Sequence, residues 1–419
     1  MSNSNQRNNP RSAPISIAVF TAAPWESAIV ALRVTGPAEM AGLRVVKGNH
    51  GPQVYPEAIP EVDLVVIQRD FPRFWRDYKK VVKLAREYGK PVIYDLDDLL
   101  VEIPEKHSHK ADYSGEMLTM LYAILDADMI TASSPFLQAY LAELNPNTKL
   151  VHNYLNDRLW GLGRKKEPQG DGSRITIGYM GGQTHQQDLE YIKDVLLNVF
   201  KKYPEIVRYK FWGTHPPREL LDLPFSDFDP INQEDYAQFA NYFSLQECDV
   251  FIAPLVDNEF NRAKSSIKFL EYSIHGSPGV YSDLPPYETI IEHGINGFLA
   301  DNLNDWESHL VTLIENPALR EQIGAAAQQT VKDGWLLSSN AHQLKEAYLL
   351  ALDERGEYYL VEDNFRNLKS ILSRAEKYQS NLEDRLYAAE NQLTEIHNSR
   401  SWNMLKKIQR IRLKIFPKR

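Results

Sequence analysis

Residues 175–185 read ITIGYMGGQTH, an apolar run that ends in glycines and leads into a helical pattern at 187–200. A strand that turns on glycines into a helix presents backbone N–H groups and the positive end of the helix dipole, which suit an anion such as a diphosphate. The spacing of Gly178, Gly181 and Gly182 does not match a dinucleotide fingerprint, and the Gly-Lys-Ser/Thr of a P-loop is missing. The stretch predicts an α/β fold, and a plain tight turn is the alternative to an anion site.

Short apolar runs alternate with helical patterns on both sides of this stretch. Unbroken apolar runs are typical of strands buried on both faces of a parallel sheet. The helical patterns between them then act as crossover connections of βαβ units. The sequence predicts two consecutive α/β halves, with strands at 15–20, 63–68, 91–94, 129–132 and 149–152 in the first half and at 175–179, 209–212, 250–254, 278–281 and 298–300 in the second.

Composition divides the chain further. The expected parts are a disordered tail at 1–14, an amino-terminal Rossmann-like domain at 15–160, a glycine-rich linker at 161–174, a second Rossmann-like domain at 175–335, a helix at 336–356 that returns toward the first domain, a helical or coiled-coil extension at 357–400 and a basic amphipathic tail at 401–419. In the extension, a seven-residue repeat indicates either a coiled coil that forms a homo-oligomer or a solvated helix. The repeat consists of Ala375, Leu382, Ala389 and Ile396.

The chain has 419 residues, a single cysteine and a formal net charge of -9. One cysteine excludes an intrachain disulfide, and no signal peptide is recognisable, so we expect a cytoplasmic protein. Cys248 directly precedes an apolar run and is interpreted as a core thiol. No window approaches the ~20 apolar residues of a membrane-spanning helix. The acidic balance argues against a nucleic-acid-binding surface.

The last part of the chain differs in charge. Residues 402–419 carry seven basic side chains and no acidic one. An apolar face at helical spacing is formed by Leu405, Ile408, Ile411 and Ile415. Each Lys or Arg near an anionic lipid surface adds on the order of 1 kcal/mol to binding. We expect this tail to bind an anionic membrane surface at the inner face of the cell membrane, and nucleic acid is the weaker alternative.

A second polar stretch, residues 258–272, reads NEFNRAKSSIKFLEY. Lys264 and Ser265 fall at an expected helix start, where the ammonium could meet a phosphate and a serine hydroxyl could cap the helix. Lys268 and Glu271 follow near the same face, so two ammonium groups and a carboxylate can converge on one ligand. The alternative is an exposed lattice of ion pairs, which contributes little stability.

Three carboxylates follow an expected strand of the first half, at Asp95, Asp97 and Asp98. Open α/β sheets bind ligands at the carboxyl ends of their strands, so these residues are candidates for catalysis or substrate contact. The alternatives are a loop and helix-capping role, or a divalent metal site, because the Asp-x-Asp spacing suits oxygen ligation. His107 and His109 alternate sides in a loop, and we expect no metal site there.

A set of motifs then occurs in a fixed order. They are GYMGGQTH at 178–185, FWG at 211–213, CDVFIAP at 248–254, KSSIKFLEY at 264–272, GSP at 276–278, SDLPPY at 282–287 and GINGF at 294–298. In this order they resemble the donor half of GT-B glycosyltransferases, and they are most similar to the retaining family 4 group and its relatives in bacterial surface-polysaccharide clusters. The resemblance covers roughly 175–352 well and the amino-terminal half less specifically. It implies two Rossmann-like domains facing a cleft, the first for the acceptor and the second for the donor.

The resemblance also implies a role for each matching residue. The glycine turn would face the donor diphosphate, Lys264 and Lys268 would neutralise its charge, and Glu271 would contact the ribose. The donor-binding candidates are therefore Gly181, Gly182, Gln183, Thr184, His185, Gly213, Lys264, Ser265, Lys268 and Glu271.

Two positions depart from the family pattern. Many members carry two glutamates eight positions apart, and Ala263 stands where the first would be. Asn258 or Asn261 could replace that glutamate by hydrogen bonding. His185 lies near the position of an expected lysine.

The first half offers further candidates by its similarity to related bacterial transferases. The acceptor-side candidates are Arg33, Arg69 and Asn153, and the catalytic candidates are Asp95, Asp97, Asp98 and Lys264. We expect an enzyme that moves a sugar from a nucleotide diphosphate to a glycan or lipid-linked glycan in O-antigen-type polysaccharide synthesis, with retention of configuration and without a metal or other cofactor. The alternatives are an epimerase or phosphorylase of the same fold, and a non-enzymatic scaffold that binds sugar nucleotides.

Overall fold

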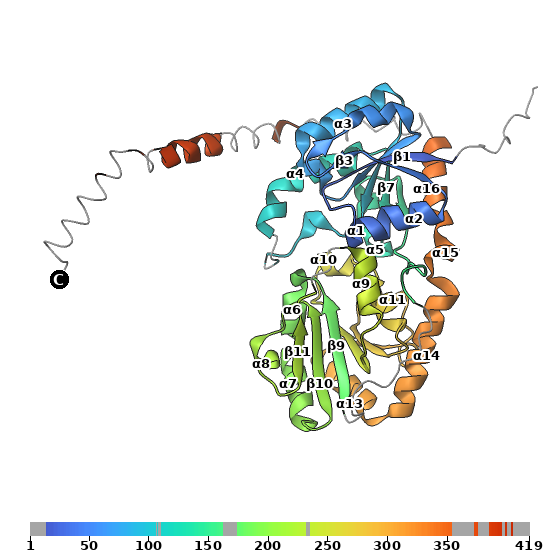
Figure 1. Ribbon diagram of the computed structural model, residues 1–419, viewed down its shortest axis with the longest axis vertical. Helices are drawn as coiled ribbons and strands as arrows, with labels where there is room; N and C mark the ends of the chain where they lie inside the picture. The colour runs from blue at the N-terminus through green and yellow to red at the C-terminus, as the bar shows by residue number, and fades with distance from the viewer. Residues whose placement is uncertain are drawn as a thin grey trace, which may run out of the picture. The chain divides into compact units, whose positions relative to one another are not determined.

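A computed structural model describes residues 14–105, 107, 110–161, 174–231, 235–353, 373–375, 385–395, 399 and 404. The chain divides into two compact units, Met1–Leu360 and Val361–Arg419. The first unit contains two six-stranded parallel sheets with helices packed around them (Figure 1), which confirms the predicted fold class. The expected tail at 1–14, the linker at 161–174, the extension at 357–400 and the basic tail at 401–419 lie wholly or largely outside the described residues.

The amino-terminal sheet has the strand order β2-β1-β5-β6-β7-β8, and all neighbouring strands are parallel. Its central strands are buried on both faces, which explains why they appear in the sequence as unbroken apolar runs. The strands are β1 Ser16–Thr21, β2 Arg44–Lys47, β5 Leu64–Gln68, β6 Val92–Leu96, β7 Met129–Ala132 and β8 Thr148–Leu150. A separate hairpin pairs β3 (Asn49–His50) with β4 (Gln53–Val54).

The second sheet has the order β11-β10-β9-β12-β13-β14 and is also parallel. Its strands are β9 Ile175–Gly181, β10 Val207–Gly213, β11 Ser226–Asp229, β12 Val250–Ala253, β13 Gly279–Ser282 and β14 Phe298–Ala300. The predicted strands of both halves are present, with bounds shifted by a few residues. The edge strands β2 and β11 are not predicted, because their short polar sequences RVVK and SDFD contain no apolar run of strand length.

Helices connect the strands as crossovers. In the first half they are α1 Ala28–Val30, α2 Gly36–Met40, α3 Trp75–Glu87, α4 Lys110–Asp126 and α5 Pro135–Leu144. In the second half they are α6 Gln186–Tyr191, α7 Lys193–Lys202, α8 Arg218–Leu221, α9 Tyr236–Phe243, α10 Glu259–Arg262, α11 Ile267–Ser273, α12 Pro285–Glu288, α13 Leu303–Glu315 and α14 Pro317–Gly334. No helix within the described ranges has the length and hydropathy that crossing a membrane requires.

The helix predicted at 187–200 is wrong in one respect, because it is divided. A short 3-10 turn, Gln183–His185, follows the glycines, and α6 then ends at Tyr191, with Ile192 between it and α7. An anion at the glycine turn would therefore meet a 3-10 turn rather than the start of one long α-helix.

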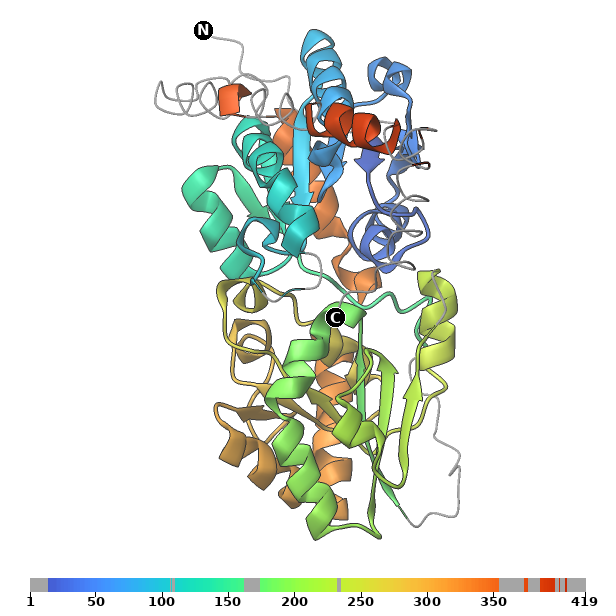
Figure 2. The same ribbon diagram turned by 90° about the vertical axis from the view of Figure 1, so that its left-hand side faces the viewer.

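The chain returns to the first half through helices α14 to α16. Helix α14 packs on α11 of the second half, and α15 (Leu337–Asn340) and α16 (His342–Asp353) contact α2 of the first half (Figures 1 and 2). The apolar face of α16 is buried in a core cluster with strand β1 and helix α1. Helix α16 is therefore structurally part of the amino-terminal half.

Candidate active site

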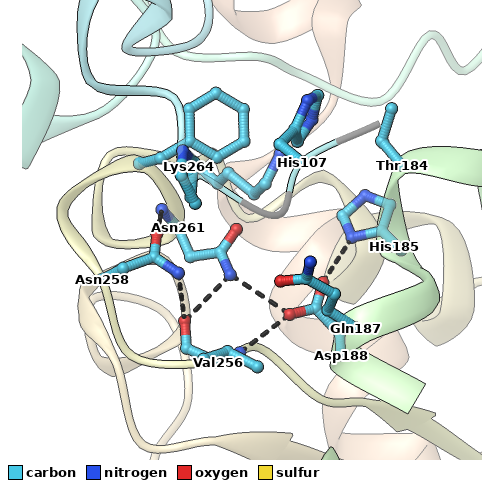
Figure 3. Close-up of a pocket in the computed structure, with 11 residues that line it drawn as sticks. His107, Thr184, His185, Gln187, Asp188, Val256, Asn258, Asn261 and Lys264 are labelled. Carbon is cyan, nitrogen blue, oxygen red and sulfur yellow. Dashed lines mark hydrogen bonds and ion pairs between the residues drawn. The ribbon is translucent and has the colours of Figure 1, made fainter. Parts of the chain in front are cut away.

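A cavity lies where loops of the two halves meet (Figure 3). The first half contributes Pro104 and His107, which precede α4. The second half contributes Thr184, His185, Gln187, Asp188, Val256, Asn258, Phe260, Asn261 and Lys264. The loops after β9 and β12 thus bring two predicted motifs, the glycine turn and the lysine segment, to one place.

Positions 181 and 182 are glycines for different structural reasons. A side chain at Gly181 would bring its Cβ within 2.5 Å of the Tyr179 hydroxyl, so this glycine is required by internal packing. Gly182 is exposed, has a φ of -69°, and would have open space around an added Cβ. Gly213 ends β10 with a φ of 80°, and a Cβ there would lie 2.3 Å from the Gly181 carbonyl oxygen. Of these three glycines, only Gly182 has open space on the side where a Cβ would stand.

Lys264 lies in the loop between α10 and α11, not at a helix start as predicted. Its Nζ is 3.5 Å from Asp98 Oδ1 of the first half and 4.4 Å from the centre of the Phe260 ring. The predicted serine cap is also wrong, because Ser266 occupies the N-cap position of α11 without a side-chain hydrogen bond. Ser265 instead accepts a hydrogen bond of 2.9 Å from Asn153 across the two halves.

Lys268 is buried beneath the glycine turn. Its Nζ donates a 3.0 Å hydrogen bond to the Tyr179 hydroxyl. Burial lowers the pKa of Lys268 to about 7, although the nearby Asp188 carboxylate favours the charged form. Lys268 therefore supports the turn from behind, and it is not exposed in the cavity as the resemblance suggests.

Glu271 is buried on the same helix. Tyr236, the first residue of α9, donates a hydrogen bond of 3.2 Å to its Oε1, and Trp160 donates one of 3.1 Å to the Tyr236 hydroxyl. Burial raises the pKa of Glu271 to about 8, against the opposing effects of the Tyr236 hydrogen bond and Lys268. Tyr236 is a site residue that no sequence motif indicates.

His185 and Asp188 form a pair at the wall of the cavity (Figure 3). His185 Nδ1 lies 2.7 Å from one Asp188 oxygen, and the other oxygen accepts hydrogen bonds from the Val256 N–H and from Asn261. Burial raises the pKa of Asp188, but the hydrogen bonds from His185 and Val256 outweigh it and lower that pKa overall. The histidine-to-aspartate spacing of three residues on a helix is the signal that could have indicated Asp188.

Of the three carboxylates predicted after β6, Asp97 and Asp98 face this region. Arg69 Nη1 lies 2.8 Å from Asp97 and 3.1 Å from Asp98. Burial raises the pKa of Asp97 to about 6, whereas Lys264 and Arg69 together overcome the effect of burial and lower that of Asp98 to about 2. The backbone of Arg69 has a φ of 47° here, which is uncommon for a residue other than glycine. Lys264 joins the two halves electrostatically through Asp98.

Asp95 and Arg33 are paired with each other inside the amino-terminal half. Asp95 is 1% exposed and Arg33 is 2% exposed. The Arg33 guanidinium binds both oxygens of Asp95, and Thr131 donates a hydrogen bond of 2.6 Å to the same carboxylate. Arg33 also donates to Asn153, which lies 3.0 Å away. The structure thus places Asp95 and Arg33 in an internal ion pair of the amino-terminal half, and the catalytic role of Asp95 and the acceptor-side role of Arg33 stay predictions.

Packing explains the missing glutamate. Ala263 is fully buried in the core cluster of the first half, and Ser134 donates a 2.6 Å hydrogen bond to its carbonyl oxygen. A glutamate at this position would bring its carboxylate next to buried apolar side chains, where an unpaired charge is costly. Asn258 caps α10, and Asn261 donates to Asp188 and to the Val256 carbonyl, so both amides hold the loop.

The side chains that line the cavity favour an anionic ligand. Lys264 brings a cation to the cavity, Thr184 adds a hydroxyl group, and His185 lies in the same wall. Within the part of the chain that the structure describes, no cluster of three metal-ligating side chains occurs. Cys248 is buried, as predicted for a core thiol.

Comparisons with known proteins agree with the fold described above. Residues 174–316 match the family model described as glycosyl transferases group 1. Similar solved structures include sucrose-phosphate synthase from Thermosynechococcus elongatus, with 14% identity, a TM-score of 0.58 and coverage of 81% of this chain and 99% of that chain. HepE from Anabaena in complex with UDP-glucose has 15% identity and a TM-score of 0.58, and the match covers 80% of this chain and 100% of that one.

A glycosyltransferase from Rickettsia africae is similar at 14% identity and a TM-score of 0.55, covering 81% of this chain and 99% of that one. No curated protein sequence matched the chain. The chain therefore has the GT-B fold, as the sequence motifs predict, and its residues 174–316 are similar to the glycosyl transferases group 1 family.

Proposed function

We propose that this protein is a glycosyltransferase that transfers a sugar from a nucleotide diphosphate donor to a glycan or lipid-linked glycan. The observation that carries the proposal is the meeting of Lys264, His185 and Thr184 at one cavity, directly after the glycine turn of β9. The HepE structures of the same fold hold UDP-glucose or UDP, which supports a nucleotide sugar as the donor.

The mechanism follows from the charge that develops on the leaving group. When the bond between the sugar carbon and the diphosphate oxygen breaks, its electron pair stays on the diphosphate. Lys264 would neutralise this charge within a partly buried site, where a fixed cation has a large effect. The acceptor hydroxyl would then bond to the same sugar carbon and pass its proton to the departing phosphate, which agrees with a retaining reaction. Closure of the two halves would exclude water.

The cellular role remains part of the proposal. Surface polysaccharide synthesis, metal-independent catalysis and binding of residues 402–419 to an anionic membrane are expected from sequence patterns. Flotation with anionic vesicles tests the last of these. A chain truncated before Trp402 should no longer float with the vesicles, and unchanged flotation would remove the membrane interaction from the proposal.

Calorimetry with a panel of UDP, GDP and dTDP sugars tests donor binding. The wild type should bind at least one of them, and Lys264→Ala should weaken that binding by about tenfold or more, because a charge-assisted contact to phosphate is lost. Lys83→Ala is the matched control, since the Lys83 side chain is 78% exposed on α3. Failure of the whole panel to bind, or equal affinity in the Lys264 variant, would contradict the proposal.

A further inference from the structure

The hydrogen bonds around Asp188 define the state of the His185 ring. Both Asp188 oxygens act as acceptors, one for the Val256 N–H at 2.8 Å and the Asn261 amide at 3.2 Å, and the other for the imidazole at 2.7 Å. The carboxylate is 5% exposed, so it is fixed in place. His185 Nδ1 must carry a hydrogen to donate to it. In a neutral ring, Nε2 is then a bare acceptor, and it points away from Asp188 (Figure 3).

The groups around the His185 ring favour its neutral form as long as no nucleotide sugar is bound. Burial lowers the pKa of His185 to about 4, and the charges of Lys268 and Lys264 add to this effect, while Asp188 opposes it. Asp98 of the first half interacts electrostatically with the ring, and His107 faces the same cavity. Two ammonium groups thus disfavour a third cation at this wall.

A diphosphate changes this balance. Its oxygens are acceptors only, so a neutral His185 would present a lone pair to another acceptor. A bound anion near the ring also offsets the charges of Lys264 and Lys268 and favours the protonated form. Asp188 already supplies a buried counter-charge on the opposite side of the ring. The pair is therefore arranged to accept a proton and to become a donor only when an anion is present.

We propose that His185 takes up one proton from solvent when the donor diphosphate binds, and that the resulting imidazolium donates from Nε2 to a diphosphate oxygen. This inference rests on the proposed glycosyltransferase function. His185 would then be a catalytic residue, because the same hydrogen bond stabilises the charge that collects on the diphosphate as the bond to the sugar breaks. Asp188 is the positioning residue that holds the ring. The proton returns to solvent when the nucleoside diphosphate leaves.

Calorimetry at about pH 6, in two buffers of different ionisation enthalpy, measures the uptake directly on the wild type. Nucleotide sugars are the probes, because their diphosphate has no group that titrates near neutral pH. Lys268 and Glu271, with pKa values of about 7 and 8, are already largely protonated at this pH and cannot account for the uptake. Asp97, with a pKa of about 6, is the remaining candidate, and variants separate it from His185.

We expect uptake close to one proton per bound donor, and affinity that weakens about tenfold per pH unit between about pH 5 and pH 7. His185→Gln should remove both the uptake and the pH dependence. His185→Lys should keep the affinity with little or no uptake, because an amine is already largely protonated at this pH. Donor binding without uptake in the wild type, or uptake that persists in His185→Gln, would overturn this inference alone. If no nucleotide sugar binds at all, both the proposed function and this inference fail.

Discussion

At the scale of single residues, the two turn glycines separate a structural requirement from a functional one. A Cβ at Gly181 would collide with the Tyr179 side chain, whereas a Cβ at Gly182 would meet no atom within 4 Å. A sequence pattern shows both as glycines before a helix. Only the packing of the side chain two residues earlier reveals which one must be glycine for the fold.

A pair of alanine variants tests this distinction. Gly181→Ala should lower the free energy of unfolding by roughly 1–3 kcal/mol, because the new methyl group overlaps the Tyr179 ring. Gly182→Ala should leave stability unchanged and weaken donor binding by about tenfold, because the methyl group enters the space offered to the ligand. Urea unfolding and calorimetry on both variants provide the two readings. The reverse pattern would contradict the assignment.

The buried Glu271 carboxyl should make stability depend on pH. Its pKa in the folded chain is about 8, above the ordinary 4.5, so the folded state holds more protons than the unfolded state between these values. Stability contributed by this group is present below about pH 4.5 and is lost as the pH rises toward 8. Glu271→Gln should therefore gain stability relative to the wild type between about pH 5 and 8, by roughly 1–3 kcal/mol.

Urea unfolding at several pH values gives the comparison. Exposed Glu57→Gln is the matched control and should show no such trend. A constant difference between Glu271→Gln and the wild type across this range would mean that Glu271 is ionised in the folded chain.

Residue motifs predicted part of the site and not the rest. Lys264, His185 and Thr184 are found together, as the resemblance implies. The burial of Asp95 with Arg33 could not be predicted, because a carboxylate after a strand can point into the core or out of the sheet edge. Tyr236 reaches Glu271 only through the packing of α9, and no local sequence pattern predicts this contact.

At the scale of elements, helix α10 and the loop after it connect the two halves. Phe260 packs in a cluster with Leu100, Ile103 and Met120 of the first half, while Lys264 faces Asp98. The donor-side lysine is thus held by a carboxylate of the opposite half. A diphosphate must compete with Asp98 for this cation.

Asp98→Asn should therefore strengthen donor binding by about threefold to tenfold, because the competing charge is removed from a partly buried pair. Calorimetry with the nucleotide sugar that the wild type binds provides the test. Asp222→Asn, which alters an exposed ion pair on α8, is the control and should have no effect. Weaker donor binding in Asp98→Asn would show that Asp98 supports the donor site instead.

Buried elements were easier to predict than exposed ones. The central strands have unbroken apolar runs because both faces are covered, and each was predicted. Edge strands β2 and β11 lack that signal, since solvent covers part of their surface. The break between α6 and α7 at Ile192 was missed because the apolar spacing of the helix continues across it.

At the scale of the whole molecule, two halves with the same architecture and the returning helix α16 form one unit that holds the cavity. Lys264 of the second half, which lines that cavity, faces Asp98 of the first half, and Arg69 pairs with Asp97 and Asp98 within the first half. This arrangement supports the capture of an anionic leaving group rather than covalent catalysis by a nucleophile.

The most direct test measures nucleoside diphosphate released from nucleotide sugars in the presence of extracted lipid-linked acceptor. We predict release by the wild type and by the exposed control Lys83→Ala, and a rate at least about 100-fold lower for Lys264→Ala, because a preorganised charge at the leaving group is removed. Release that occurs equally fast in Lys264→Ala, or no release by the wild type from any nucleotide sugar, would contradict the account.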